Sequence, residues 1–153
     1  ERYRTGHLED AILFLPYGCA VDEFQHRAYE NPGMTPDERA EVWREIEAIY
    51  LPHRTYERMS HHESGRLWQQ QRHIFSRPFY YIDYCLAQTC ALQMWHMSRQ
   101  DRTTTMKQYR QLCKLGGSLP FTGLLDAVGL ANPFKAGCLT DVCNAAAASL
   151  KLN

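Results

Sequence analysis

Apolar residues recur along most of this chain at the three- and four-residue spacing of helices. No segment shows the strict apolar–polar alternation of a half-buried strand. We therefore predict an all-α fold of about six or seven helices. The first predicted helix covers His7 to Tyr29, with an interruption near Pro16 and Gly18, because proline removes a backbone donor and glycine is a poor helix former.

A capping box with a proline at the first helical position opens the second predicted helix, where Thr35 is followed by Glu38. This helix is predicted to run to about Leu51, because Pro52 cannot continue it. The apolar residues predicted to face inward are Val42, Ile46 and Ile49.

A long segment with almost no charge follows a polar loop that we predict from Arg54 to Glu63. It forms a predicted central helix from Pro78 to about Arg99, in which Asp83 is the only acidic or basic residue before Ser98, histidine aside. A helix that is apolar on all sides is a buried one. We therefore place it at the centre of the fold and expect part of its cover to come from outside this chain. The other predicted helices are Gly65–Phe75, Asp101–Leu115, Pro120–Val128 and Leu139–Leu150.

Length and charge narrow the function classes. A chain of 153 residues suits one domain. Its 17 basic residues balance 17 acidic ones, which argues against non-specific nucleic-acid binding and against a basic membrane surface. The longest apolar stretch, Ala11 to Val21, is far short of the roughly 20 residues that a membrane span needs. The chain starts with neither a methionine nor a signal peptide, so we expect a cytoplasmic protein and a piece of a longer one.

Cysteine usage agrees with a reducing compartment. No two of the six cysteines have the C-x-x-C spacing of zinc or redox sites, and most lie within apolar patterns. We predict that they are buried, reduced thiols. They stand at positions Cys19, Cys85, Cys90, Cys113, Cys138 and Cys143.

The histidines do not form a recognisable metal motif. The sequence H-E-x-x-H is absent, and Glu23 with His26 is the one Glu-x-x-His pair. Di-iron bundles need a second such pair and two more carboxylates. Glu23 and His26 are therefore predicted to form a surface or supporting pair. A small helical metal protein centred on Glu23, His26 and His73 stays open as an alternative.

The segment from His73 to Gln88, HIFSRPFYYIDYCLAQ, holds a histidine and three tyrosines. Tyr81 and Tyr84 are three residues apart and share a face on a helix. A histidine and a tyrosine face can donate hydrogen bonds to one point, as an oxyanion requires. The same tyrosines can also be packed core residues whose hydroxyls bond the backbone, as in a helical protein-interaction module. Spacing alone leaves both interpretations open.

Three strings in the chain resemble the C-terminal part of an oligoendopeptidase F-type zinc metallopeptidase, of the thimet-oligopeptidase-like branch. They are LPYGCAVDEFQHRAYENP (Leu15 to Pro32), RHIFSRPFYYIDYCLAQTCALQMW (Arg72 to Trp95) and LGGSLPFTGLLDAVGL (Leu115 to Leu130). The resemblance implies a nearly all-helical metalloendopeptidase that cleaves short peptides in a deep channel. Two histidines of an H-E-x-x-H helix and a later glutamate hold the zinc in that family, and the motif glutamate is the general base.

Site residues follow from the same resemblance. His73 matches the family's substrate-binding histidine, and Tyr81 and Tyr84 match the tyrosines that bond the scissile carbonyl and the oxyanion. Tyr80 is a rival to Tyr81, because Tyr80 and Tyr84 are four apart and also share a face. Glu23 and His26 would lie close behind the site.

The absence of H-E-x-x-H is the main departure from the family pattern. The zinc ligands and the base are therefore expected N-terminal to Glu1, and residues 1–153 would be the C-terminal part of a catalytic domain. We expect no metal or other cofactor in this chain and no hydrolysis by it alone. Its expected partners are an oligopeptide substrate and the N-terminal part of the same protein, and the isolated fragment could self-associate.

Overall fold

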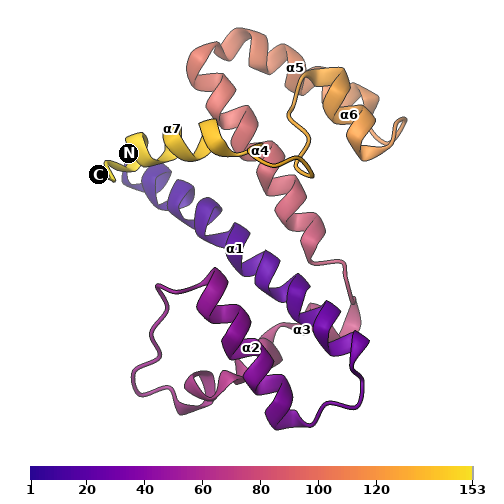
Figure 1. Cartoon of the computed structure of the whole chain (residues 1–153). Coiled ribbons are helices and arrows are strands. Elements are labelled where there is room, and N and C mark those ends of the chain that lie inside the picture. Colours follow the sequence, from indigo (N-terminus) through magenta and orange to yellow (C-terminus); the bar gives the residue numbers. More distant parts are fainter. Residues whose placement is uncertain (153) are drawn as a thin grey trace. The chain divides into compact units, whose positions relative to one another are not determined.

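The computed structural model describes residues 1–152 (Figure 1). In this range it contains seven α-helices, one π-helical turn, one 3-10 turn and no strand, which confirms the predicted all-α fold. The elements are α1 (Arg2–Glu30), α2 (Pro36–Tyr50), η1 (His62–Arg66), η2 (Leu67–Gln70), α3 (Arg72–Ser76), α4 (Ile82–Gln100), α5 (Arg102–Leu115), α6 (Phe121–Val128) and α7 (Thr140–Leu150). The chain packs as two compact units, one of residues 12–85 and one of residues 1–11 with those from 86 onward.

Helix α1 continues through Pro16 and Gly18, so the predicted interruption is wrong. The lost backbone bond at proline costs about 3 kcal/mol in a helix interior. Tertiary packing offsets that cost, because Val21 and Phe24 of the same helix are completely or almost completely buried. Packing explains why position 18 is a glycine, since a Cβ there would collide with Sγ of Cys85.

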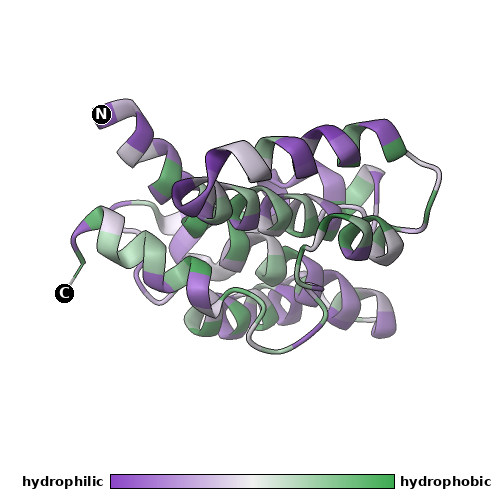
Figure 2. Cartoon of the chain, turned by 90° about the horizontal axis from the view of Figure 1, so that it is seen from above, coloured by the Kyte–Doolittle hydropathy of each residue, from purple (hydrophilic) through white to green (hydrophobic). Residues whose placement is uncertain are grey.

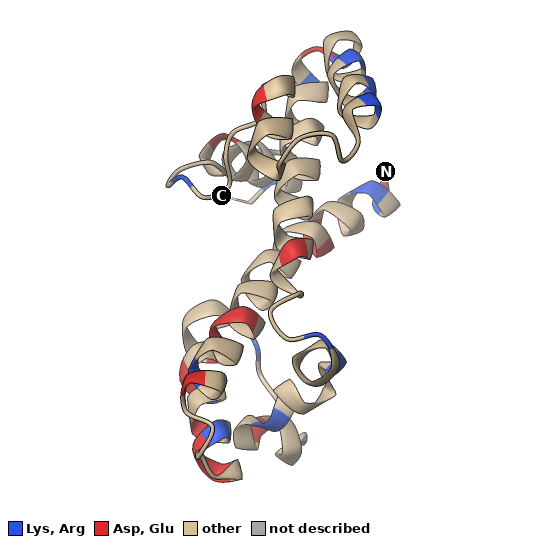
Figure 3. Ribbon diagram, turned by 90° about the vertical axis from the view of Figure 1, so that its right-hand side faces the viewer, with Lys and Arg blue, Asp and Glu red and all other residues tan. Residues whose placement is uncertain are grey.

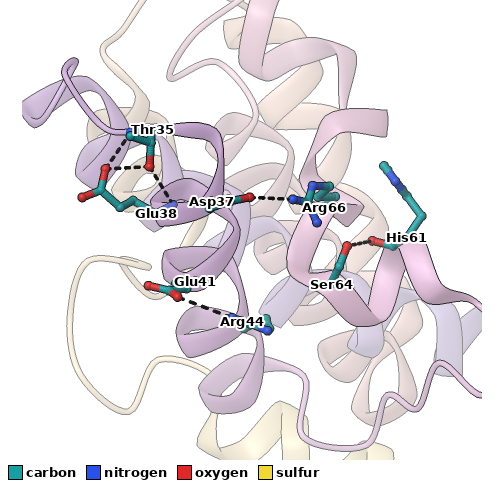
Figure 4. Close-up of polar contacts among 8 residues, drawn as sticks. All are labelled: Thr35, Asp37, Glu38, Glu41, Arg44, His61, Ser64 and Arg66. Atoms are coloured by element: carbon teal, nitrogen blue, oxygen red, sulfur yellow. Dashed lines mark hydrogen bonds and ion pairs between the residues drawn. The ribbon is translucent and has the colours of Figure 1, made fainter.

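Helix α2 begins at the predicted capping box, which Figure 4 shows. The Thr35 hydroxyl accepts from the Glu38 N–H at 3.3 Å, and the Glu38 carboxylate accepts from the Thr35 N–H at 2.7 Å. Ile46 faces the core as predicted and Val42 is half-buried against it. The prediction is wrong for Ile49, which is 67% exposed, because the buried face of α2 consists of Ala40, Trp43, Ile46 and Glu47.

The core of the unit formed by residues 12–85 is built on aromatic contacts. The Phe24 ring meets Trp43 edge-on at 5.6 Å between ring centroids and lies 4.7 Å from Trp68. Such pairs add about 0.5–1.5 kcal/mol to the burial of their apolar area. The buried members of this core are Ala20, Val21, Phe24, Trp43, Ile46, Leu51, Leu67, Trp68 and Ile74.

The predicted helix from Gly65 to Phe75 is wrong in detail, because η1, η2 and α3 divide that segment. Gly65 has φ 80°, and a Cβ there would strike the backbone oxygen of Ala40. Only glycine therefore lets η1 lie so close to α2. An ion pair of 2.7 Å between Arg66 and Asp37 joins the same two elements (Figure 4).

Helix α4 begins at Ile82, four residues later than the predicted Pro78. The delay follows from Phe79, whose φ of 61° lies in the left-handed region and cannot belong to an α-helix. This chain does not cover the helix on every side, since Tyr84 is 41% exposed. Its buried residues are Cys85, Thr89, Leu92 and Gln93.

The second unit contains α5, α6 and α7, which lie where the sequence places them. The Asp101 carboxylate caps α5 by accepting from two backbone N–H groups, at 3.0 and 3.1 Å. Gln93 of α4 holds Ala131 with both ends of its amide, accepting from the N–H at 2.7 Å and donating to the carbonyl at 3.0 Å. The buried core of this unit is Leu125, Val128 and Leu130.

Polar and apolar segments alternate along the helices (Figure 2), and charges of both signs are spread over them (Figure 3). Within residues 1–152, no helix combines the length and the apolar content that crossing a bilayer would require.

All six cysteines are free thiols in the structure. The prediction of burial holds for Cys85 and is wrong for Cys113 and Cys143, which are exposed. A hydrogen bond with Cys85 lowers the pKa of Cys19 to about 7, and the same bond raises the pKa of Cys85.

Candidate active site

A short helix and a sharp turn bring the predicted site residues together. Helix α3 has five residues, and it ends where the Arg77 N–H bonds the carbonyl of His73 at 2.9 Å. The chain then turns at Phe79, and the Asp83 N–H bonds the Tyr80 carbonyl at 3.1 Å. After this turn, Tyr81 and the first turn of α4 lie within aromatic contact of His73.

His73 and the three tyrosines form one aromatic cluster. The centroid of the His73 ring lies 5.0 Å from that of Tyr81, 5.7 Å from Tyr84 and 6.4 Å from Tyr80. Tyr84 meets Tyr80 and Tyr81 edge-on, at 5.3 and 5.5 Å. The structure therefore brings together His73, Tyr81 and Tyr84, and it places the rival Tyr80 in the same cluster. Tyr81 lies in the turn before α4 rather than inside the helix.

The tyrosines differ in their surroundings. Tyr81 packs against the rings of Phe14 and Tyr17, at 5.9 and 6.0 Å, and burial raises its pKa. Tyr80 and Tyr84 are nearly half exposed, and a hydrogen bond with Tyr80 raises the pKa of Tyr84. A raised pKa keeps a hydroxyl protonated, so Tyr81 and Tyr84 remain hydrogen-bond donors above the ordinary tyrosine range.

A chain of hydrogen bonds reaches His73 from the core. The Tyr17 hydroxyl donates to Oε1 of Gln71 at 2.9 Å, and Nε2 of Gln71 lies 2.7 Å from Nδ1 of His73. Gln71 adopts an extended backbone conformation immediately before α3, and its side chain does not cap that helix. Neither residue was identified from the sequence, since their positions carry no motif.

A cavity of about 470 Å³ adjoins the histidine. It is lined by Arg72, His73, Ser76 and Arg77, so two arginines and a histidine are among its lining residues, while the Ser76 hydroxyl already donates to the Arg72 carbonyl at 3.1 Å. Donors of this kind suit the carbonyl oxygens and carboxylates of a peptide.

Gln25 is a second residue that the sequence does not single out. It is completely buried, and its Oε1 accepts the N–H of Phe79 at 2.8 Å. The residue therefore fixes the turn that presents Tyr80 and Tyr81. The sequence does show a polar residue, Gln25, at an inward position of a helix. That pattern does not reveal which group the side chain hydrogen-bonds.

Neither Glu23 nor His26 contacts His73 among the interactions of the described residues. Glu23 forms an ion pair of 2.6 Å with Arg27, and the carboxylate of Asp22 lies 3.5 Å from His26. The His26 ring also lies 4.9 Å from that of Phe79, which leads into the turn.

The residues present do not fit a metal ion. In the described range, 1–152, no group of three or more histidine, cysteine, aspartate or glutamate side chains converges as a metal site requires. Glu23, His26 and His73 in particular do not gather into such a group.

Buried tyrosines should make the protein sensitive to alkali. Burial raises the pKa of Tyr17 and of Tyr56 to about 12, above the ordinary value of 10.0. Because the folded state holds these protons more tightly, their contribution is complete below about pH 10 and is lost as pH rises toward 12. Urea unfolding at a series of pH values should show this loss, with a smaller slope in Tyr17→Phe. Tyr3→Phe, at a site 81% exposed, should keep the wild-type slope. Equal slopes for Tyr17→Phe and wild type would contradict the assignment.

Comparison with known proteins identifies similar solved structures. An X-ray structure assigned as an oligoendopeptidase F superimposes with a TM-score of 0.92 at 51% identity. PZ peptidase A with an inhibitor gives 0.92 at 48%, and an oligoendopeptidase F from Bacillus anthracis str. Ames gives 0.78 at 42%. Each match covers 99% of this chain and 27%, 27% and 24% of the respective relative. The chain thus spans about a quarter of their length.

Among curated proteins, none matches the chain. The profile of peptidase family M3 matches residues 1–142, and with the structural matches it confirms the resemblance to oligoendopeptidase F. The chain belongs to peptidase family M3.

Proposed function

We propose that the intact protein is a zinc-dependent oligoendopeptidase, and that this chain supplies the side of its active site that binds the scissile carbonyl. The observation that supports it most is the convergence of His73 with Tyr80, Tyr81 and Tyr84 beside a cavity lined by hydrogen-bond donors. Membership of family M3 supplies the reaction class, hydrolysis of a peptide bond.

The proposed chemistry rests on the donors that this chain presents. His73, Tyr81 and Tyr84 donate hydrogen bonds to the carbonyl oxygen of the substrate, and these bonds strengthen as negative charge develops on that oxygen. Donors held in place before the reaction stabilise the transition state without reorganisation, and losing one typically costs about 10²–10³ in rate. The arginines at the cavity would bind further along the peptide backbone or at its carboxylate.

Zinc belongs to the proposal for the intact enzyme, with its ligands outside residues 1–153. The partners proposed are a short peptide and the remaining part of the same protein. The proposed location is the cytoplasm, which the free thiols support.

Cleavage of a quenched fluorescent peptide tests the proposal directly. The full-length protein should cleave the peptide, lose activity to a chelator and regain it on addition of zinc. This chain alone should cleave none. His73→Ala in the full-length protein should lower kcat by about 10²–10³. Chelator-sensitive cleavage by this chain alone, or unchanged kcat in His73→Ala, would contradict the proposal.

A further inference from the structure

The direction of the Gln71 amide is determined by Tyr17. The Tyr17 hydroxyl donates to Oε1 of Gln71, and within residues 1–152 it has no other hydrogen-bond partner. If the amide turned over, its NH₂ group would face the hydroxyl, and the tyrosine proton would lose its acceptor. Leaving a half-buried donor unpaired costs free energy. Burial of this hydroxyl is also what raises the pKa of Tyr17 to about 12.

That direction decides which nitrogen of His73 carries the proton. With Oε1 turned toward Tyr17, the Nε2 group of Gln71 faces Nδ1 of His73 at 2.7 Å and must donate to it. A nitrogen that accepts a hydrogen bond holds no proton in the neutral ring. The single proton of the neutral imidazole therefore lies on Nε2.

We propose that Tyr17 and Gln71 are positioning residues that hold His73 in the tautomer with its proton on Nε2, ready to donate to the substrate carbonyl. The inference rests on the proposed function of His73. Neither residue touches the substrate in this account, since both act through the imidazole. The arrangement makes the donor independent of titration, because Nε2 carries a proton in the neutral and in the charged ring.

Replacing Gln71 with glutamate reverses the direction of the hydrogen bond to Nδ1 of His73 while keeping the shape of the side chain. A carboxylate can only accept, so it draws a proton to Nδ1 of His73. The doubly protonated ring still donates from Nε2, but the neutral ring then keeps its one proton on Nδ1. The donor is therefore lost in Gln71→Glu as pH rises, and retained in the wild type.

The experiment measures kcat/KM of the full-length enzyme between about pH 6 and 9, dividing each variant by wild type at the same pH. The ratio for Gln71→Glu should fall by about 10- to 100-fold from the acid to the alkaline end. Dividing by wild type cancels groups that titrate in both proteins. The titratable groups around His73 are Tyr80, Tyr81, Tyr84, Arg72 and Arg77, with Tyr17 beyond Gln71.

Three further variants separate positioning from packing. Gln71→Met has similar volume and no hydrogen bonds, so its ratio should be lowered equally at every pH. Tyr17→Phe frees the amide to turn over, so its ratio should fall with pH as in Gln71→Glu, but less. Tyr29→Phe is the matched control, because the Tyr29 hydroxyl donates to the carbonyl of Ile74, the neighbour of His73 in α3, at 3.2 Å. Its ratio should not depend on pH.

Parallel, pH-independent ratios for Gln71→Glu and Gln71→Met would overturn the inference, as would a Gln71→Glu ratio that stays at one. If Gln71→Glu does not fold, the slope of Tyr17→Phe decides the matter alone. His73→Ala, measured in the same series, keeps the two ideas apart. If His73→Ala is active, the proposed function is wrong. If His73→Ala is inactive and the ratios of the Gln71 variants do not change with pH, only the positioning role of Tyr17 and Gln71 is wrong.

Discussion

Replacing Tyr84 with phenylalanine in the intact enzyme is expected to lower kcat by about 10²–10³-fold and to change KM little. The substitution removes one hydroxyl and keeps the ring, so the edge-on contacts with Tyr80 and Tyr81 persist. In the proposed role, the lost donor acts on charge that appears only in the transition state. The loss should therefore fall on kcat rather than on ground-state binding.

Steady-state kinetics on one peptide would also show whether Tyr80 or Tyr81 acts together with Tyr84. The variants to compare are Tyr80→Phe, Tyr81→Phe and Tyr84→Phe. Tyr80 shares a hydrogen bond with Tyr84, whereas Tyr81 is packed against Phe14 and Tyr17. The variant whose kcat falls together with that of Tyr84→Phe marks the second donor.

Tyr109→Phe is the control, since Tyr109 is a half-exposed tyrosine of α5, 49% exposed against 41% for Tyr84. Its kinetics should match those of wild type. A higher KM with unchanged kcat in Tyr84→Phe would show uniform binding and would remove Tyr84 from the oxyanion role.

Replacing Gln25 with methionine is expected to lower the free energy of unfolding by about 1–3 kcal/mol and kcat by about 10- to 10²-fold. Methionine fills the buried space but accepts no bond from the Phe79 N–H. Phe79 then loses the contact that holds its left-handed backbone, a conformation that persists only where its surroundings enforce it. Since Tyr80 and Tyr81 follow at once, their rings should shift.

Gln93→Met is a close match for this variant. Gln93 is also buried, at 6% exposure, and its Oε1 likewise accepts a backbone N–H, that of Ala131. Urea unfolding and peptide cleavage on both variants give the comparison. Both should be destabilised, while only Gln25→Met should lose kcat. Equal kcat in the two variants would show that Gln25 stabilises the fold without positioning the site.

Local signals in the sequence located most helix ends. Thr35 and Glu38 form a cap whose partners lie three residues apart, and Asp101 caps α5 with its next neighbours. Such contacts are complete within one turn, so spacing alone reveals them. The same locality placed His73 and its tyrosines in one segment.

Contacts between distant residues could not be predicted. Pro16 sits inside a helix because packing of α1 outweighs a local rule. Phe79 takes a positive φ because Gln25, 54 residues earlier, holds its N–H. The Gln71 amide is likewise held by a hydrogen bond from Tyr17, 54 residues away. The sequence shows the residue types in these pairs but not the pairing.

Family membership bears on the two interpretations of the tyrosines that spacing left open. Aromatic residues that serve as packing alone would be expected deep in a core. Tyr80 and Tyr84 are instead 46% and 41% exposed, and both contact His73, which lines the cavity. That exposure, in a member of a peptidase family, favours contact with a substrate over an interaction module.

The close approach of Gly18 and Cys85 makes the two positions interdependent in any redesign or divergence of the protein. The space that a methyl group would need at position 18 is already filled by the sulfur at position 85. A larger residue at 18 becomes acceptable only with a smaller one at 85, although 67 positions separate them in the numbering. Variation at either site therefore has to be judged as a change in a pair.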